Sequence, residues 1–304
     1  MTMTYRIAAV VALVAACAGP PPVVQAPGPR VVSLHDVTTE LVVALGAAGR
    51  LVGVAEPVDV DHSVGAAIAA VPRVGDLESI LAVRPTVVLG LAVVGAQDPQ
   101  LVARLREAGV AVELGDPTTL ADVFALTRTV SSWVGAGPAG DALAARLMAE
   151  AHAVEGGAAS DAVAARLASE ARAVAPGLVQ RARPGHRVRV FVYDCCDPPF
   201  TAGERTVLSD LIARAGGDNV FADVAAGWTH VSWEAVVARR PELVVIDAYR
   251  YDGQADVVGK QRAIGAISAL AGLPTVVVPL RCVLGGLCSL EGLARLRAAI
   301  GAGT

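Results

Sequence analysis

The chain has 304 residues, 54% of them hydrophobic, which is enough to build one large domain or two lobes with separate cores. Its formal net charge is −4, and no run of basic residues stands out along it. Nucleic acid is therefore not an expected partner, because a basic surface is what attracts a phosphate backbone.

The first 17 residues have the composition of an export signal. One basic residue, Arg6, precedes an apolar run over residues 7–16, which is too short to span a bilayer but has the length of a signal-peptide core. The letters V-A-A-C that end at Cys17 resemble a bacterial lipobox, which implies cleavage before Cys17 and acylation of that residue. The alternative is an ordinary secretion signal with an incidental cysteine.

Residues 18–29 are rich in proline and glycine, show no apolar period, and predict a flexible tether. Together, the signal (residues 1–17) and the tether predict a protein of the cell envelope. It is expected to be lipid-anchored to a membrane and to face the periplasm or the exterior.

Residues 30–117 alternate between apolar runs and helical patterns. Strands are expected at residues 31–34, 51–55, 87–94 and 110–114, with helices between them. Unbroken apolar runs separated by helices are typical of a parallel sheet that is covered on both faces. These residues therefore predict an amino-terminal α/β lobe.

Residues 118–186 have helical spacing. Within them, residues 141–154 are repeated as residues 161–174, and both copies are rich in Ala, Leu, Arg and Glu, which favour helix. The repeat predicts one long helix or two stacked helices, with a break, if there is one, at Gly156 and Gly157. Such a helical segment would connect two lobes rigidly.

Residues 187–304 predict a second lobe, because they repeat a unit of the first. Glu78 is followed seven residues later by a proline in E-S-I-L-A-V-R-P, and Glu234 at the same spacing in E-A-V-V-A-R-R-P. In both copies the glutamate lies in the first turn of a short helix, and the proline separates this helix from an apolar run typical of a buried strand. The predicted fold is α/β, with two parallel-sheet lobes joined by a long rigid helix.

Ligands of open α/β sheets bind at the carboxyl ends of the strands, so residues after each predicted strand are candidates for a cleft between the lobes. A histidine next to an aspartate could ligate iron or haem, but such a pair is also common at a helix start. Arginines could bind an anionic chelate through paired hydrogen bonds, or be solvated surface residues. The candidates are His35, Asp36, Glu56, Tyr193, Asp194, Tyr249, Arg250 and Arg281.

Three motifs in the second half resemble those of one protein family. They are D-P-P-F-T-A-G at residues 197–203, A-G-G-D-N-V-F-A-D at residues 215–223 and G-W-T-H-V-S-W-E at residues 227–234. From Arg30 onward the chain is similar to the vitamin B12-binding and ferric-siderophore-binding proteins of bacterial ABC importers. The resemblance implies a class III periplasmic-binding fold with the ligand in the cleft, little hinge motion, no resident cofactor and no enzymatic activity.

The resemblance also suggests roles for three residues. Glu78 and Glu234 match the glutamates, one per lobe, that engage arginines of the membrane permease; a plain helix-terminal acid is the alternative for each. Trp228 matches an aromatic residue that packs against the ligand in the B12-binding relative, and core packing is its alternative. The loop after Ala55 departs from that relative, because it carries acidic residues and His62 in place of an aromatic residue.

Four cysteines follow Cys17, namely Cys195, Cys196, Cys282 and Cys288. An even number in an exported protein favours disulfides, and both pairs fall in loops at the same predicted edge of the second lobe. We therefore expect at least one disulfide, and a bond between a cysteine of the first pair and one of the second is feasible. The alternative is a soft-metal site in which these thiolates face His35, His62 or His230.

The sequence thus predicts a lipid-anchored substrate-binding component of an ABC importer, which captures a ferric siderophore, haem or corrinoid between its lobes. Its expected partners are the permease and ATPase, the metal chelate and the membrane, and a monomer is expected. The alternatives are a receptor for a free transition metal held by Cys, His and Asp, and an envelope metalloenzyme or sensor on the same fold. The sequence has no G-x-S-x-G or H-E-x-x-H motif to support an enzyme.

Overall fold

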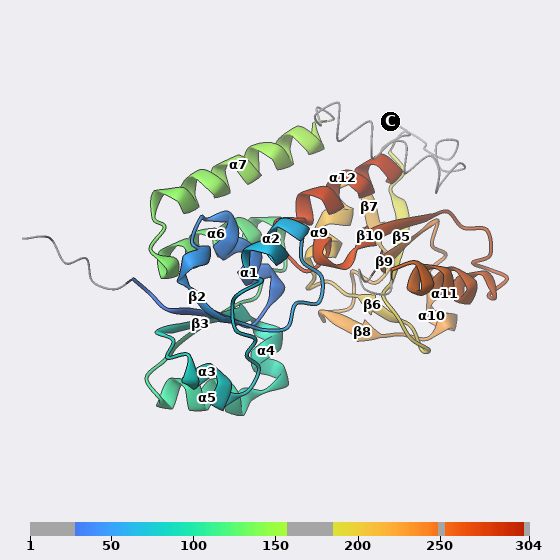
Figure 1. Cartoon of the computed structure of the whole chain (residues 1–304). Helices are drawn as coiled ribbons and strands as arrows, with labels where there is room; N and C mark the ends of the chain where they lie inside the picture. Colours follow the sequence, from blue (N-terminus) through green and yellow to red (C-terminus); the bar gives the residue numbers. More distant parts are fainter. Residues whose placement is uncertain (1–27, 157–184, 249–252, 301–304) are drawn as a thin grey trace, which may run out of the picture.

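Each half of the chain builds a four-stranded parallel sheet (Figure 1). The computed structural model describes residues 28–156, 185–248 and 253–300. The first sheet has the order β2-β1-β3-β4, from β1 (Val31–Ser33), β2 (Leu51–Val54), β3 (Val87–Leu91) and β4 (Ala111–Gly115). The second has the order β10-β9-β5-β7, from β5 (Val188–Tyr193), β7 (Gly217–Asn219), β9 (Leu243–Ala248) and β10 (Thr275–Pro279). Counted along the chain within each lobe, both sheets run second, first, third, fourth, so the repeat in the sequence is also a repeat of topology.

The strands form from the apolar runs, and helices cover the sheets. All five residues of β3 are buried, as are the first five of β9, which fits strands covered on both faces. The first lobe has α1 (Asp36–Ala44), η1 (Ala48–Arg50), α2 (His62–Ala67), α3 (Leu77–Ala82), α4 (Ala92–Gln97) and α5 (Pro99–Glu107). The second has α9 (Val207–Arg214), α10 (Trp233–Ala238), α11 (Gly253–Gly265), η2 (Leu280–Cys282) and α12 (Ser289–Ile300), with β6 (Phe200–Ala202) and β8 (Trp228–His230) as an antiparallel pair. In the described part of the chain, no helix has the length and apolar character needed to cross a membrane.

The repeated unit begins with a capped six-residue helix in each lobe. The Asp76 carboxylate accepts a hydrogen bond from the Ser79 amide at 2.7 Å at the start of α3, and the Ser232 hydroxyl accepts one from the Ala235 amide at 3.2 Å at the start of α10. Such caps satisfy amide groups that the helix itself leaves unpaired. The second residue of each helix is the repeated glutamate, as the sequence predicts.

Both copies also end in the same backbone conformation. Arg84 and Arg240 adopt positive φ angles of 47° and 49°, and each precedes a proline, which disfavours continuation of the helix. The Arg84 carbonyl accepts a hydrogen bond from Nε of Arg30 at 2.9 Å, and the Arg240 carbonyl accepts one from Nε of Arg189 at 2.7 Å. These two arginine clasps, Arg30 with Arg84 and Arg189 with Arg240, fix the end of each short helix next to the central strand of its sheet.

Two antiparallel helices, α6 (Leu120–Val134) and α7 (Pro138–Glu155), connect the lobes. They are separated at Gly135, which caps α6 with a left-handed φ of 70°. α6 packs against α1 of the first lobe and α9 of the second, while α7 packs against α6 and against α12 of the second lobe (Figure 1). α7 ends at Glu155, just before the glycine pair where a break was expected, and the second copy of the helical repeat lies outside the described residues.

One hydrophobic cluster extends across both lobes and the connecting helices. Its buried members include Leu41 of α1, Leu126 of α6, Leu147 of α7, Leu211 of α9 and Leu296 of α12. Two smaller clusters lie within the individual lobes, one around Ile80 and Leu105 and one around Phe191 and Phe221. Because close-packed apolar surfaces resist sliding, the shared cluster favours a fixed orientation of the lobes.

Candidate functional site

A cavity of about 410 Å³ lies between the lobes, at the carboxyl ends of strands from both sheets. The first lobe lines it with Leu34, His35, Asp36, Ala55, Glu56, Val58, Val93, Val94 and Gln97. The second lobe lines it with Asp194, Phe200, Trp228, Asp247, Leu280 and Leu284. Such a position is where ligands of open α/β sheets bind, so this cavity is the candidate binding site.

Five of the residues predicted to bind ligand line the cavity. They are His35, Asp36, Glu56, Asp194 and Trp228. The structure therefore brings together residues from both lobes. The two that lie farthest apart in the sequence, His35 and Trp228, are separated by 193 positions. Tyr249 and Arg250 lie outside the described residues, as does the predicted lipidation site Cys17.

His35 and Asp36 both have structural partners at the start of α1. Nδ1 of His35 accepts a hydrogen bond from the Val37 amide at 3.2 Å, which makes His35 the N-cap of the helix. Burial lowers the pKa of His35, against the opposing effect of Asp36, so the neutral imidazole is favoured. The Asp36 carboxylate accepts hydrogen bonds from the Val58 and Asp59 amides at 2.9 and 2.8 Å. These contacts hold the loop after β2 against the helix and shape the wall of the cavity.

Trp228 and Phe200 form an aromatic wall on the second lobe. Their rings are stacked, with centroids 6.0 Å apart and planes inclined by 24°. Both residues lie in the antiparallel pair β6 and β8, and both line the cavity. Trp228 also packs against the shared hydrophobic cluster. The contact with the cavity and the core packing, which the sequence left as alternatives, therefore occur together.

Tyr193 does not line the cavity. Its side chain is only 4% exposed, it packs beside Phe191 and Trp233, and its hydroxyl donates a hydrogen bond to the Cys196 carbonyl at 3.0 Å. Burial, followed by nearby aspartates, raises the pKa of Tyr193, which keeps the phenol neutral. Tyr193 is thus part of the core of the second lobe, and its strand neighbour Asp194 is the residue that lines the cavity.

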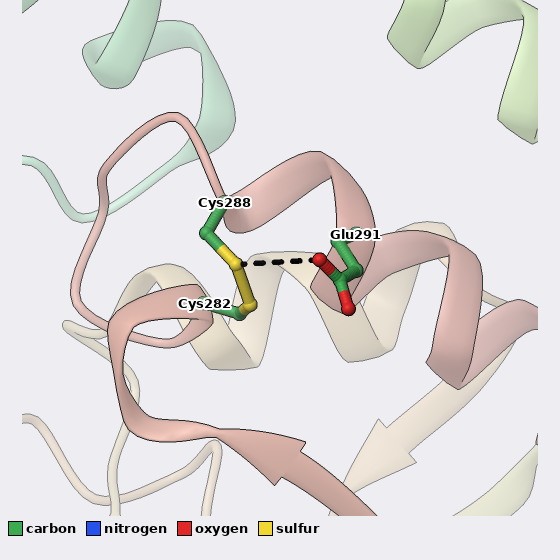
Figure 2. Close-up of side chains that lie close together, drawn as sticks. All are labelled: Cys282, Cys288 and Glu291. Carbon is green, nitrogen blue, oxygen red and sulfur yellow. Dashed lines mark hydrogen bonds between the residues drawn. A yellow bond between two sulfur atoms is a disulfide. The ribbon is translucent and has the colours of Figure 1, made fainter. Parts of the chain in front are cut away.

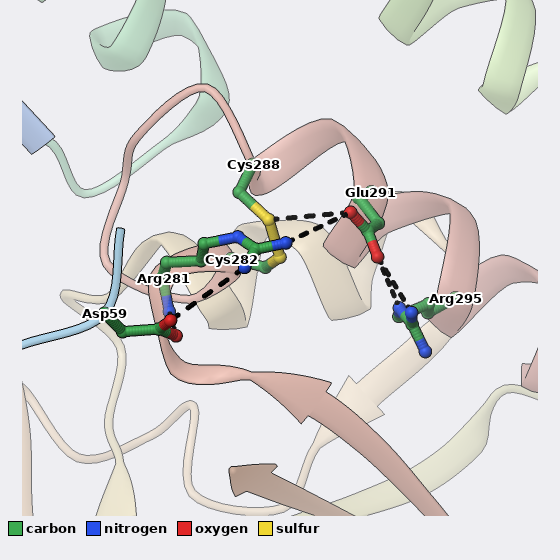
Figure 3. Close-up of a disulfide and its surroundings, with 6 residues drawn as sticks. All are labelled: Asp59, Arg281, Cys282, Cys288, Glu291 and Arg295. Atoms are coloured by element: carbon green, nitrogen blue, oxygen red, sulfur yellow. Dashed lines mark hydrogen bonds and ion pairs between the residues drawn. A yellow bond between two sulfur atoms is a disulfide. The ribbon is translucent and has the colours of Figure 1, made fainter. Parts of the chain in front are cut away.

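Arg281 also lies away from the cavity wall and instead joins the two lobes. Its backbone amide donates to Oδ2 of Asp59 at 3.2 Å, and its guanidinium lies 3.9 Å from Asp59 Oδ1 and 3.9 Å from Glu291 (Figure 3). Glu291 is also paired with Arg295 at 2.8 Å. Arg281 is therefore paired with carboxylates of the protein itself.

Glu40 is a buried acid close to this contact. Burial is the largest cause that raises its pKa to about 7, with further increases from Asp36, Asp59 and Asp61 and an opposing decrease from Arg281. The side chain is mostly buried, so the neutral carboxyl is favoured up to about neutral pH.

Asp247 is a lining residue that the sequence prediction missed. It lies in β9, its side chain is fully buried, and Nζ of Lys260 donates to its carbonyl oxygen at 2.6 Å and to its Oδ1 at 3.2 Å. Lys260 also pairs with Asp256 at 2.9 Å. Burial and then the adjacent Asp194 carboxyl raise the pKa of Asp247 well above its ordinary value, and Lys260 opposes them. An acidic residue inside the apolar run L-V-V-I-D-A was the signal that could have identified it.

Each cysteine pair forms a disulfide within its own loop. Cys195 is bonded to Cys196, and Cys282 is bonded to Cys288 (Figure 2). The expected disulfide is therefore present, while a bond between the two loops, which the sequence left feasible, does not form. Cys282 ends η2 and Cys288 directly precedes α12, and the turn between them, which includes Gly285 at a φ of 81°, brings these two together.

The described residues contain one group that could hold a metal ion, formed by Cys282, Cys288 and Glu291. Its sulfur atoms are joined in the disulfide, and Glu291 Oε2 lies 3.8 Å from Cys288 Sγ (Figure 2). A disulfide sulfur is a poor ligand compared with a thiolate. The predicted soft-metal site with His35, His62 or His230 is not assembled within the described residues, because none of these histidines joins the group.

The two predicted docking residues are both exposed at helix starts. Glu78 lies in the first turn of α3 on the first lobe, and Glu234 lies in the first turn of α10 on the second. The backbone amide of Glu234, followed by the Ser232 hydroxyl, lowers the pKa of the Glu234 side chain. The helix start therefore favours the ionised form of Glu234, with its negative charge on the surface.

Comparison with known proteins supports the same architecture. The family model described as periplasmic binding protein matches residues 31–272. The vitamin B12-binding protein of Yersinia pestis (strain Pestoides F) is 27% identical over 251 residues, which cover 82% of this chain and 76% of that protein.

Solved structures with the same fold cover nearly the whole chain. A periplasmic binding protein from Veillonella parvula superposes with a TM-score of 0.74 at 20% identity, covering 92% of this chain and 94% of that one. The periplasmic heme-binding protein of Roseiflexus sp. RS-1 superposes with a TM-score of 0.67 at 25% identity, covering 91% and 99%. The vitamin B12-binding protein of Vibrio cholerae gives a TM-score of 0.67 at 19% identity, covering 90% and 96%.

Proposed function

The chain belongs to the periplasmic binding protein family, and on that premise we propose that it captures a metal chelate between its lobes and delivers it to the permease of an ABC importer. The observation that carries the proposal is the cavity between the lobes, which is lined by strand ends of both sheets. A site shared by two lobes can enclose a ligand much larger than a single ion. The protein is a transport binding protein and not an enzyme.

The class of ligand is suggested by the relatives. Curated and structural relatives are named as binding vitamin B12 or heme, and one solved relative is an Fe3+-hydroxamate transport protein from Saccharomonospora viridis. A corrinoid, haem or ferric siderophore is therefore the proposed cargo. Trp228 and Phe200 supply the aromatic surface on which such a flat or bulky ligand can pack.

A receptor for a free transition metal is less well supported. The group of described residues that could hold an ion does not line the cavity, and its two sulfurs are oxidised to a disulfide. Within the cavity, Asp36 is bonded to the loop after β2, and His35 caps α1. The chelate is accordingly the preferred cargo.

Delivery is proposed to use one glutamate from each lobe. Glu78 and Glu234 are exposed at equivalent positions of equivalent helices, so two acidic contacts are available to arginines of a permease. The shared hydrophobic cluster and the connecting helices favour a fixed spacing between these contacts. We further propose that Cys17 carries the lipid anchor that holds the protein at the membrane, together with the permease and its ATPase.

The decisive experiment is native mass spectrometry of the protein purified from its own host under mild conditions. A metal chelate that travels with the protein, and that is displaced by the same chelate in excess, is the expected result. Mutation of Trp228 to alanine should reduce the bound fraction, while mutation of the distant, exposed Asp218 to asparagine should not. A bare metal ion, or a ligand retained equally by both variants, would contradict the proposal.

A further inference from the structure

Three exposed arginines lie together where the sheet of the first lobe begins. Arg30 and Arg50 directly precede β1 and β2, whose first residues are register partners. Arg84 follows α3, and its carbonyl accepts a hydrogen bond from Nε of Arg30 at 2.9 Å. A side chain at Gly28 would collide with the Arg50 guanidinium, so Arg50 lies against the start of the described chain. These three arginines form the amino-edge patch.

The charge of the amino-edge patch is not neutralised within the described residues. The Arg30 guanidinium donates to two backbone carbonyls, at 2.9 and 2.7 Å, and these acceptors carry no net charge. In the described part of the chain, none of Arg30, Arg50 and Arg84 forms an ion pair. At the end of α5, the exposed Arg106 and Glu107 offset one another. The patch thus concentrates three positive charges at one edge of a chain whose net charge is −4.

The equivalent arginine of the second lobe is neutralised, although its clasp is otherwise the same. The Arg30 amide donates to Oγ1 of Thr86 at 3.0 Å, and the Arg189 amide donates to Oε2 of Glu242 at 3.0 Å. Thr86 and Glu242 both directly follow the proline of the repeated unit. Because the second lobe has a carboxylate at this position, the Arg189 guanidinium also pairs with Glu242, at 3.5 Å. One residue of the repeat thus decides whether the arginine of the clasp is neutralised.

Two further arginines at this edge of the second lobe are also paired with acids. Arg187, which directly precedes β5, pairs with Asp218 at 2.6 Å, and Arg239, just after α10, pairs with Asp223 at 2.6 Å. Their neighbour Arg240 is exposed and has no ion pair among the described residues. The fold therefore does not require a patch of unpaired arginines, and the patch that occurs lies in the lobe at which the described chain begins.

The amino-edge patch lies close in sequence to the proposed lipid anchor. Gly28 follows Cys17 by eleven residues, which span at most about 40 Å. An acyl group on Cys17 would therefore keep this edge of the sheet within reach of the bilayer surface. Arginine binds phosphate through paired hydrogen bonds, and each arginine near an anionic membrane surface contributes about fivefold to affinity. Charge and position thus both fit the phosphate groups of anionic phospholipids.

We propose, on the premise of the lipid anchor at Cys17 proposed above, that the amino-edge patch binds anionic phospholipid headgroups and holds the first lobe against the membrane. The patch lies at the amino ends of the first-lobe strands, whereas the cavity lies at the carboxyl ends of the same parallel strands. The contact therefore turns the cavity away from the bilayer, so that ligand can enter while the protein rests on the membrane.

The test is chemical modification of the acylated protein, purified from its own host and anchored to vesicles. The reagent is phenylglyoxal, which reacts with accessible arginines, and mass spectrometry of peptides gives the rate at each one. One set of vesicles contains phosphatidylglycerol and phosphatidylethanolamine, and the other contains phosphatidylcholine alone. Arg50 and Arg84 should react at least about fivefold more slowly on the anionic vesicles, whereas Arg240 should react equally on both. The protection should disappear in high salt, because salt screens exposed charges.

A matched pair of variants tests the charge of the patch. Thr86→Glu gives Arg30 the carboxylate partner that Arg189 has in the second lobe, and it should weaken the contact with anionic vesicles about fivefold, so that Arg50 and Arg84 lose protection. Thr86→Gln has nearly the same shape without the charge and should keep the protection. Thr86 does not line the cavity, so both variants should bind the chelate as the unmodified protein does.

Each outcome separates the membrane contact from the functions on which it builds. Equal reaction of Arg50 and Arg84 on both kinds of vesicle, or equal protection in the Thr86→Glu and Thr86→Gln proteins, would overturn the contact and leave anchoring and chelate capture intact. A protein that stays on anionic vesicles but leaves neutral ones would lack the anchor and still support the patch. A protein that stays on neither would overturn both.

Discussion

Arg281 in the second lobe binds Asp59 in the first, 222 positions away, and the carboxylate receives both its backbone amide and its guanidinium (Figure 3). Asp59 is only 2% exposed, so this contact between the lobes is shielded from water. A second contact between the lobes, from Arg205 to Asp116, is exposed on both sides, with 63% and 58% of the two side chains accessible. Because the two ion pairs differ in burial, mutation of each one measures how burial changes the contribution of an ion pair to the free energy of unfolding.

Mutation of Asp59 to alanine should destabilise the protein more than mutation of Asp116 to alanine. Loss of a buried acceptor leaves its donors unsatisfied, which costs roughly 1–3 kcal/mol, whereas an exposed ion pair contributes about 1 kcal/mol or less. Urea unfolding of both variants against the unmodified protein measures the two free energies of unfolding. An equal cost for the two substitutions would show that the buried contact does not hold the lobes together more strongly.

Stability should fall as pH rises because of Glu40. In the unfolded chain this acid titrates near its ordinary value of 4.5, and in the folded protein it titrates at about 7. Since the folded state retains a proton that the unfolded chain has released, the stabilising contribution is complete below about pH 4.5 and is lost as the pH rises through 7. At about 1.4 kcal/mol for each unit of pKa, the change is of the order of 3 kcal/mol.

Mutation of Glu40 to glutamine isolates this effect, because the amide is uncharged at every pH. Free energies of unfolding should be compared for the two proteins at about pH 5 and about pH 8. The free energy of unfolding of the variant, relative to that of the unmodified protein, should be up to about 3 kcal/mol more favourable at the higher pH than at the lower pH. A difference between the two proteins that stays constant with pH would contradict the assignment to Glu40.

If Glu78 and Glu234 dock the protein to its permease as proposed, reversal of charge at both should abolish uptake. The double variant Glu78→Arg and Glu234→Arg removes both acidic contacts and repels arginines of the permease, while neither residue lines the cavity. Uptake by cells that contain the importer and ligand affinity in solution are the two measurements, and only uptake should fall. The control reverses Glu107 and Glu204, two exposed acids on the same two lobes, and should keep uptake near its original level. Loss of ligand affinity in the docking variant would instead assign these glutamates to the site.

The disulfide connectivity can be checked by digestion without reduction. Trypsin cuts after Arg and Lys, so Cys195 and Cys196 fall in the peptide of residues 190–205 and Cys282 and Cys288 in that of residues 282–295. Each peptide should be released separately and be lighter by two hydrogens than its reduced form. A single species that contains both peptides would instead establish the bond between the loops.

Removal of the Cys282–Cys288 disulfide should cost about 2 kcal/mol if loop closure governs its effect. The pair Cys282→Ser and Cys288→Ser is suitable, with urea unfolding as the measurement. The same change at the adjacent Cys195 and Cys196 closes a much shorter loop and should cost about half as much. A larger loss at the adjacent pair would show that the bond there stabilises the protein by another route.

The positions of the core strands in both lobes were accessible from the sequence because local patterns determine them, whereas the strand order comes from the structure. Apolar runs mark β3 and β9, and the shared Glu and Arg-Pro spacing marks the repeated unit around them. The ends of predicted strands likewise nominated His35 and Asp194, because ligand sites follow the carboxyl ends of parallel strands.

The missed features depend on contacts between distant parts of the chain. Tyr193 and Asp194 are adjacent in sequence, and which of them faces the cavity depends on how the end of β5 packs. The commitment of Arg281 to Asp59 depends on how the two lobes meet, which no local pattern records. The cysteine partners were left open for a related reason, since only the fold shows that the turn after Cys282 brings Cys288 next to it.

The two arginine clasps set the end of α3 and of α10 against their sheets in the same way. Each of the two glutamates proposed for docking, Glu78 and Glu234, therefore lies in an equivalent local setting, once per half of the molecule. A permease built from two identical subunits could therefore bind both glutamates with the same pocket, present once in each subunit.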